Sequence, residues 1–195
     1  GIFTALELVK TNNTKKVLIV EMGHRIDKRS CPKDKTEVCV NCKPYCNITT
    51  GFSGAGAFSD GKLSLSPEVG GDLPELIGYK NAEELIRYTD RIYLEFGADP
   101  HVEGIGNDEE IKEIRKKAIE ANLKLVDCPI RHLGTEKAQE IYLKIQEYLL
   151  ANGVEIMFDT VAKDLVIENG IAKGLVIAPA RKQDEETTLY ADTVV

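Results

Sequence analysis

Four of the five cysteines lie close together, in a segment that we call the cysteine loop (residues 31–46). Their spacing is C-x7-C-x2-C-x3-C, and C-x2-C is a spacing at which thiolates bind zinc or an iron–sulfur cluster. The same pair could be a redox dithiol, because nearby lysines favour the thiolate form. A third interpretation is a set of reduced thiols that only shape the loop. The four cysteines are Cys31, Cys39, Cys42 and Cys46.

A glycine-rich stretch, CNITTGFSGAGAFSDGKLSLS, follows directly over residues 46–66. Small residues let a backbone approach a ligand closely, and successive N–H groups in such a turn can hold an anion. Residues 56–62 match G-x-x-x-x-G-K, but Leu63 stands where a P-loop needs a serine or threonine to bind magnesium. We therefore reject a P-loop. The stretch predicts a ligand-binding loop or, alternatively, a plain surface loop.

Glu21 ends the apolar run KKVLIVE and lies 20 positions after Gly1. In a dinucleotide-binding fold, a glycine-rich turn opens a helix whose N-terminus meets the pyrophosphate, and an acidic residue about 20 positions later binds a ribose. The spacing therefore suits Gly1 as the last glycine of G-x-G-x-x-G. A generic helix and strand with a surface glutamate would give the same spacing.

The three histidines share no metal-ligand spacing. His132 lies beside Arg131 and just before an expected helix, where it could serve anion or substrate binding, although a plain surface position is the simpler interpretation. No G-x-S-x-G is present, so the sequence gives no support to a serine hydrolase.

Hydrophobic periodicity predicts the elements that must position these residues. The chain opens in a helix, followed by a strand over 15–21 and a long irregular segment over 22–75 of the kind that is usually functional. Asn107 and Thr135 are predicted helix N-caps, Gly97 a C-cap, and the pair Asn169-Gly170 a tight hairpin turn. The later elements are helices at 81–97, 107–122 and 135–151, a strand at 123–129, and strand-like runs at 154–160, 161–170, 171–179 and 188–195.

This order of elements predicts an α/β fold with an antiparallel β-meander. We expect one domain from residues 1–75 and 135–195, with a mainly helical subdomain, 76–134, inserted into it. The chain opens at the first turn of a helix, and YADTVV ends inside an apolar run. The sequence therefore predicts a fragment of a longer protein.

The composition is that of an ordinary globular protein, with 43% hydrophobic and 29% charged residues among 195. A net charge of −7 argues against broad nucleic-acid binding, which rests on basic side chains. No apolar stretch reaches the roughly 20 residues of a membrane-spanning helix, and no signal peptide is evident. The odd, clustered cysteines favour a reducing, cytoplasmic location.

Together these motifs resemble a family of FAD-dependent dehydrogenases, or NAD(P)/FAD-dependent oxidoreductases. They belong to the two-dinucleotide-binding flavoproteins, which have a glutathione-reductase-like FAD domain. The resemblance is carried by the cysteine loop running into CNITTGFSGAGAFSDGKL, by RHLGTE before a long helix, and by the strand-rich C-terminal part. It covers essentially the whole chain and implies a Rossmann-like FAD-binding fold, truncated at both ends.

The resemblance also implies roles for particular residues. Gly1 would end the pyrophosphate turn, Glu21 would hold the adenosine ribose, and the backbone of Val161 would meet adenine. Residues along the cofactor near its flavin end would be Gly54, Ala55, Gly56, Ser59, Asp60, Gly61 and Lys62.

The implied activity is flavin-mediated hydride or electron transfer, with FAD as the cofactor of the full-length parent and NAD(P)H as a candidate reductant. The small-molecule substrate or acceptor, the catalytic residues and the oligomeric state are not predicted. Because the first strand and first two glycines of the fingerprint are absent, FAD binding is expected of the parent rather than of this fragment. The alternatives are a metal-binding or thiol-redox module built on the cysteine loop, and a non-catalytic scaffold.

Overall fold

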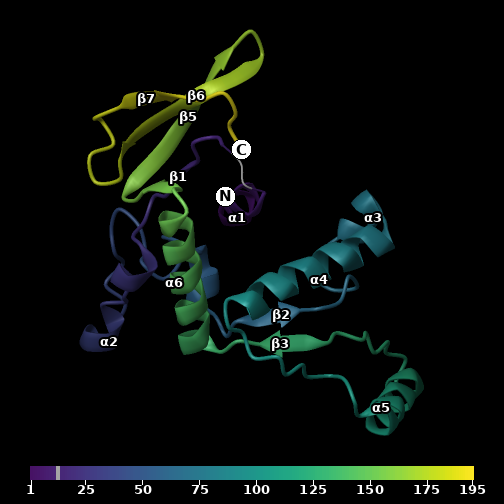
Figure 1. Ribbon diagram of the computed structural model, residues 1–195. Helices are drawn as coiled ribbons and strands as arrows, with labels where there is room; N and C mark the ends of the chain where they lie inside the picture. The colour runs from purple at the N-terminus through teal and green to yellow at the C-terminus, as the bar shows by residue number, and fades with distance from the viewer. Residues whose placement is uncertain (12–13) are drawn as a thin grey trace. The chain divides into compact units, whose positions relative to one another are not determined.

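The computed structural model describes residues 1–11 and 14–195, which form two compact units (Figure 1). Unit 1 comprises Gly1–Phe58 and Tyr142–Val195, and unit 2 comprises Ser59–Ile141. The predicted domain boundaries, after residues 75 and 134, both fall inside unit 2. The segment 59–75, with one short strand, and the first turns of a long helix therefore belong with the helical segment.

Unit 1 is built around a parallel pair of short strands, β1 (Leu18–Val20) and β4 (Glu155–Met157), in the register Leu18↔Glu155 to Val20↔Met157. Helix α1 (Ile2–Lys10) precedes β1, and α6 (Thr135–Ala151) leads into β4. Parallel strands need a crossover connection, and here the chain passes from β1 to β4 through a long crossover that ends in α6. The remaining helices of this unit are short: the 3-10 helices η1 (Ile26–Lys28) and η2 (Gly54–Phe58), and α2 (Lys33–Thr36).

The core of unit 1 forms where α1, α6 and the glycine-rich stretch bury their apolar side chains. Leu6 of α1 and Ile145 and Leu149 of α6 are completely buried, and Phe52 of the glycine-rich stretch is 1% exposed. Burying a side chain of this size contributes about 1.5–3 kcal/mol. The glycine-rich stretch is therefore anchored in the core by Phe52 rather than lying loose on the surface.

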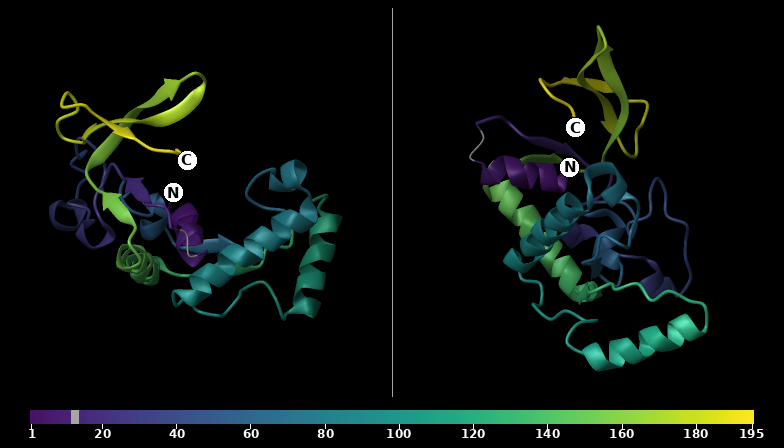
Figure 2. Two further views of the ribbon diagram at one scale, coloured as in Figure 1. Left: turned by 45° about the horizontal axis from the view of Figure 1, so that its top comes forward. Right: turned by 90° about the vertical axis from the view of Figure 1, so that its right-hand side faces the viewer.

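The C-terminal part of unit 1 is an antiparallel meander of β5 (Thr160–Glu168), β6 (Ile171–Pro179) and β7 (Thr187–Tyr190), whose three strands Figure 2 shows side by side. The predicted hairpin turn is confirmed, because Asn169 and Gly170 both have positive φ, 52° and 78°, as a two-residue type I′ turn requires. The predicted last strand is partly wrong: β7 ends at Tyr190, and the final TVV is not part of a strand.

Unit 2 contains α3 (Leu73–Ile77), α4 (Tyr79–Glu95), α5 (Asp108–Glu120) and an antiparallel pair, β2 (Lys62–Ser64) with β3 (Ile130–His132). The strand predicted at 123–129 is wrong, since that segment is irregular. Pro129 contributes only its carbonyl, which accepts from the Leu65 N–H at 2.8 Å, and has no N–H to donate, so β3 begins at Ile130.

The long helices lie where periodicity predicts them, but their ends differ in detail. Asn107 precedes α5 without a side-chain capping hydrogen bond. Thr135 is the first residue of α6 rather than its N-cap, and its Oγ1 donates to the Ser59 carbonyl at 3.1 Å. Gly97 has φ of 99° just after the C-cap Phe96, the conformation expected of a glycine that ends a helix.

Among the residues that the structure describes, no helix combines the length and the apolar character needed to cross a membrane.

Candidate functional site

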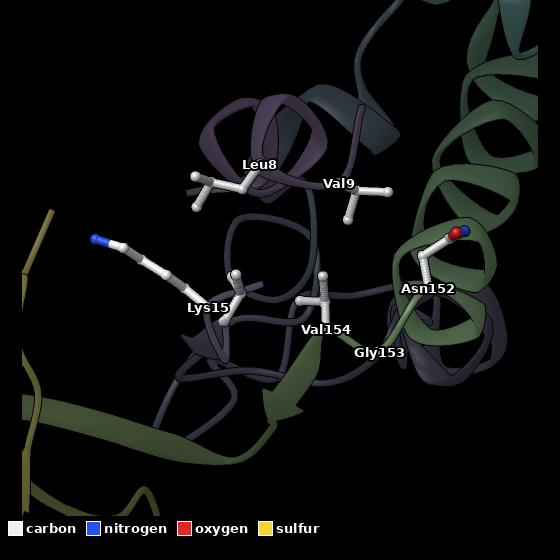
Figure 3. Close-up of a pocket in the computed structure, with 7 residues that line it drawn as sticks. Leu8, Val9, Lys15, Asn152, Gly153 and Val154 are labelled. Carbon is white, nitrogen blue, oxygen red and sulfur yellow. The ribbon is translucent and has the colours of Figure 1, made fainter. Parts of the chain in front are cut away.

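The β1–β4 pair has an amino edge, where both strands begin, and a carboxyl edge, where both strands end. Different residues lie beside each. At the amino edge is a cavity of about 270 Å³, lined by the end of α1 and by the residues that enter β1 and β4 (Figure 3). Leu8, Lys15 and Val154 are among its lining residues. Ligands of open α/β sheets bind outside the carboxyl ends of the strands, so this cavity lies at the wrong edge for a dinucleotide.

The carboxyl edge holds Glu21. Its backbone N–H donates to the Met157 carbonyl at 2.9 Å, which continues the ladder past the end of β1. Its Oε1 accepts a hydrogen bond from the Gly23 N–H at 2.8 Å. The carboxylate that the sequence singled out is therefore held at the end of β1 by the turn that follows.

The N-terminus of α1 is directed toward the same edge. The C-terminal end of α1, with Leu8 and Val9, lines the cavity at the amino edge together with Val17. The N-terminal end of α1 therefore lies toward the carboxyl edge. Gly1 precedes α1, and its carbonyl accepts from the Ala5 N–H at 3.0 Å. A Cβ on Gly1 would meet nothing within 4 Å, so the start of this helix is open.

The glycine-rich stretch packs directly on the turn after Glu21. A Cβ on Gly23 would lie 2.6 Å from the Cα of Gly51, so neither glycine can carry a side chain without moving the other segment. The Phe52 N–H donates to the His24 carbonyl at 3.0 Å. Gly23 was not among the predicted site residues, and the signal that could have found it is the E-M-G turn after the strand.

Arg29 fixes the shape of the glycine-rich stretch through hydrogen bonds to its backbone. Its guanidinium donates from Nε to the carbonyl of Asn47 at 2.8 Å, from Nη2 to Ile48 at 2.9 Å and from Nη1 to Phe52 at 2.6 Å. The residue is 5% exposed, and burial lowers the pKa of its side chain. The negative charges of Glu21 and Cys46 oppose that shift. No motif in the sequence indicated this arginine.

The residues at 53–56 combine strain with an unsatisfied polar atom. Ser53 has φ of 71°, unusual for a residue with a side chain, and its buried Oγ has no hydrogen-bond partner among the described residues. Gly54 also has positive φ, and Ala55 and Gly56 are exposed at the start of η2. Strained backbone and buried hydroxyl groups without a hydrogen-bond partner are common at ligand sites. This stretch therefore fits a polar ligand lying along it.

The predicted site residues at 59–62 belong to unit 2. Asp60 and Lys62 form an exposed ion pair at 3.1 Å, and the Gly61 N–H donates to Ser59 Oγ at 3.1 Å. The Gly61 carbonyl accepts from the Leu133 N–H at 2.8 Å, which fixes this turn beside β3. The role of these four residues near a flavin stays a prediction. So does that of Val161, which lies in β5 of unit 1 and pairs with Ala178.

A polar cluster joins the cysteine loop to the carboxyl edge. Tyr45 Oη donates to Asp159 Oδ1, and His24 Nδ1 lies 3.0 Å from Asp159 Oδ2. The His24 and Tyr45 rings meet edge-on with centroids 5.6 Å apart. Burial, followed by the hydrogen bond and charge of Asp159, raises the pKa of Tyr45 to about 12. The phenol is therefore a hydrogen-bond donor at neutral pH.

The cysteines are all free, and the structure does not gather them as metal ligands. Among the described residues, no group of three or more histidine, cysteine, aspartate or glutamate side chains could hold a metal ion. The proposed ligands Cys31, Cys39, Cys42 and Cys46 therefore find no support in the geometry. Cys46 differs in another way: N–H groups of Ile48 and Thr49, aided by Arg29, lower the pKa of its exposed thiol.

Comparison with known proteins does not identify a family. No protein family and no curated protein matches the sequence. Among solved structures, the crystal structure of Thermovibrio ammonificans THI4 is similar, with a TM-score of 0.41 and 13% sequence identity. The match covers 99% of this chain and 60% of that one, so the chain spans less than two thirds of that protein's length.

Proposed function

We propose that this chain is the FAD-binding portion of an oxidoreductase. The observation that carries the proposal is the carboxyl edge of the β1–β4 pair. Glu21 lies at the end of β1 there, and the open N-terminus of α1 at Gly1 is directed toward the same edge. A helix N-terminus favours a pyrophosphate, and a carboxylate after the strand that follows this helix favours a ribose. A dinucleotide requires this combination.

The chain's own residues would divide the work of holding the cofactor. Glu21 would accept hydrogen bonds from ribose hydroxyls, and the first N–H groups of α1 would face the pyrophosphate. Gly54 and Ala55, with the unsatisfied hydroxyl of Ser53 beside them, would lie along the cofactor. When bound, FAD supplies the hydride or electron chemistry, and the protein supplies binding and orientation.

The first prediction concerns Glu21. Changing Glu21→Gln keeps the Oε1 that accepts from Gly23 but removes the charge, and we expect FAD to bind about tenfold more weakly. The measurement is quenching of FAD fluorescence, on this chain and on the full-length protein. Glu147→Gln, an exposed change on α6 in the same unit, is the control and should leave affinity unchanged. Equal affinities for the two variants of the full-length protein would refute the proposal.

A second candidate function, thiol redox chemistry in the cysteine loop, is favoured by the environment of Cys46. Its pKa is lowered, so more of its thiol is thiolate at neutral pH, and the thiolate is the reactive form. We expect iodoacetamide to alkylate Cys46 faster than Cys39, which is also exposed. The pH at which Cys46 reacts at half of its maximal rate should lie below about 8.5, the value typical of a free cysteine.

The alkylation is followed for each cysteine by peptide mass spectrometry between pH 5.5 and pH 9.5, a range chosen around the value for an ordinary thiol. Cys39 serves as the internal control, because it lies in the same loop and is exposed as well. Equal rates and equal pH midpoints at the two cysteines would remove the reason for a redox role.

A further inference from the structure

A second cavity lies wholly within unit 2 and takes no part in the site described above. Its volume is about 620 Å³, within the range of about 300–1,000 Å³ typical of small-molecule sites. It lies between the segment that follows α4, the end of β3 and the first turn of α6. Its polar and charged lining residues are Asp99, His101, Glu103, His132 and Lys137.

The wall formed by the segment after α4 is held by buried Arg131. Its Nη1 donates to the carbonyl of Asp99 at 2.7 Å and to that of His101 at 3.3 Å. The same guanidinium binds the Asp90 carboxylate of α4 through Nε at 2.5 Å and Nη2 at 2.8 Å. Arg131 is 4% exposed, so the wall is fixed before any ligand arrives.

Further along, backbone pairing fixes the same segment to the start of β3. The Glu103 N–H donates to the Ile130 carbonyl at 2.8 Å, and the Ile130 N–H donates back to Glu103 at 3.0 Å. The side chain of Glu103 thus starts from a fixed backbone position at the cavity.

The lining carries available groups of both charge types. The imidazoles of His101 and His132 and the carboxylate of Glu103 have no side-chain partner among the residues that the structure describes. Asp99 uses one oxygen, Oδ1, to accept from the His101 N–H at 2.8 Å. Lys137 pairs with Glu140 at 2.9 Å, but that pair is solvent-exposed and therefore weak.

We propose that this cavity binds a small zwitterion, a molecule with one ammonium and one carboxylate group, such as an amino acid or a short peptide. The carboxylates of Asp99 and Glu103 accept hydrogen bonds from the ammonium group. Imidazole N–H groups and the Lys137 ammonium donate to the carboxylate. A purely anionic ligand would be repelled by the two carboxylates, and a purely cationic one would leave Lys137 and the imidazole N–H groups without a partner. The proposal does not depend on flavin binding.

Three probes with one skeleton test the charge requirement: triglycine, N-acetyltriglycine and triglycinamide. We expect saturable binding of triglycine by isothermal titration calorimetry, with the His101 and His132 ring signals shifting in NMR spectra. Each analogue lacks one charge and should bind about three- to fivefold more weakly, because the groups that meet the charges are largely solvent-exposed. Absence of saturable triglycine binding, or equal binding of either analogue, would overturn the proposal.

Variants then locate the binding. Glu103→Gln should weaken triglycine binding about three- to fivefold and should reduce the preference for triglycine over N-acetyltriglycine, with Asp99 left as the one carboxylate. His132→Gln should weaken it while preserving the preference over N-acetyltriglycine. Glu110→Gln on α5, an exposed residue outside the cavity, is the matched control. Unchanged affinity in both cavity variants, with folding verified by circular dichroism, would show that triglycine binds elsewhere and would overturn the assignment.

Discussion

Arg29→Met is expected to lower the free energy of unfolding by about 3 kcal/mol, one of the two largest losses that we predict for a single substitution. The guanidinium donates to the carbonyls of Asn47, Ile48 and Phe52, and methionine fills similar space without any donor. Leaving one buried acceptor unsatisfied costs about 1–3 kcal/mol, and the carbonyl of Phe52 lies deepest of the three.

The same change should also alter the chemistry of the neighbouring thiol. Arg29 is one of the groups that lower the pKa of Cys46, so its removal should raise that pKa and slow alkylation at neutral pH. The loss of stability is measured by urea unfolding followed by circular dichroism. Lys28→Met, at the exposed neighbouring position, removes a positive charge without touching those carbonyls and is the control. A urea midpoint equal to that of Lys28→Met would contradict the role given to Arg29.

The elements that the sequence predicts well are those whose cause is local. The long helices α4, α5 and α6 have an apolar repeat over three or more turns, and Asn169-Gly170 encodes its own turn conformation. The strand expected at 123–129 fails for an equally local reason. Its apolar residues suggested a strand, but Pro129 has no N–H to donate, and the available partner, β2, pairs with residues 130–132.

The contacts that shape the candidate site are of another kind. Gly23 and Gly51 need to be glycine because two distant segments meet there, and neither segment alone shows it. The cluster of His24, Tyr45 and Asp159 joins three separate parts of the chain in the same way. Residue spacing could single out Glu21, because the number of positions from the start of a helix to a carboxylate after the next strand is set by that one helix and that one strand. Residue spacing could not indicate Arg29, which holds the glycine-rich stretch.

Asp90→Ala is expected to destabilise the protein by about 3–5 kcal/mol, because it leaves the buried Arg131 charge without its partner. The side chains of Asp90 and Arg131 are 14% and 5% exposed, and the hydrogen bonds that Arg131 donates to Asp90 raise the pKa of Arg131. An arginine side chain is effectively always protonated in proteins, so Arg131 stays charged when its partner is removed. Glu84→Ala, on the same helix but in an exposed ion pair, is the control and should cost less than about 1 kcal/mol.

The double variant Asp90→Leu/Arg131→Met separates two effects: the loss of stability caused by an unpaired buried charge, and the loss of the contacts by which Arg131 holds the cavity wall. Replacing a whole buried pair by apolar side chains is often neutral, so urea unfolding should show most of the stability restored. Arg131 also holds the carbonyls of Asp99 and His101, and methionine cannot. The double variant should therefore stay well folded and still bind triglycine more weakly. Stability as low as that of Asp90→Ala would mean that these carbonyl contacts, rather than the ion pair, are what stabilise unit 2.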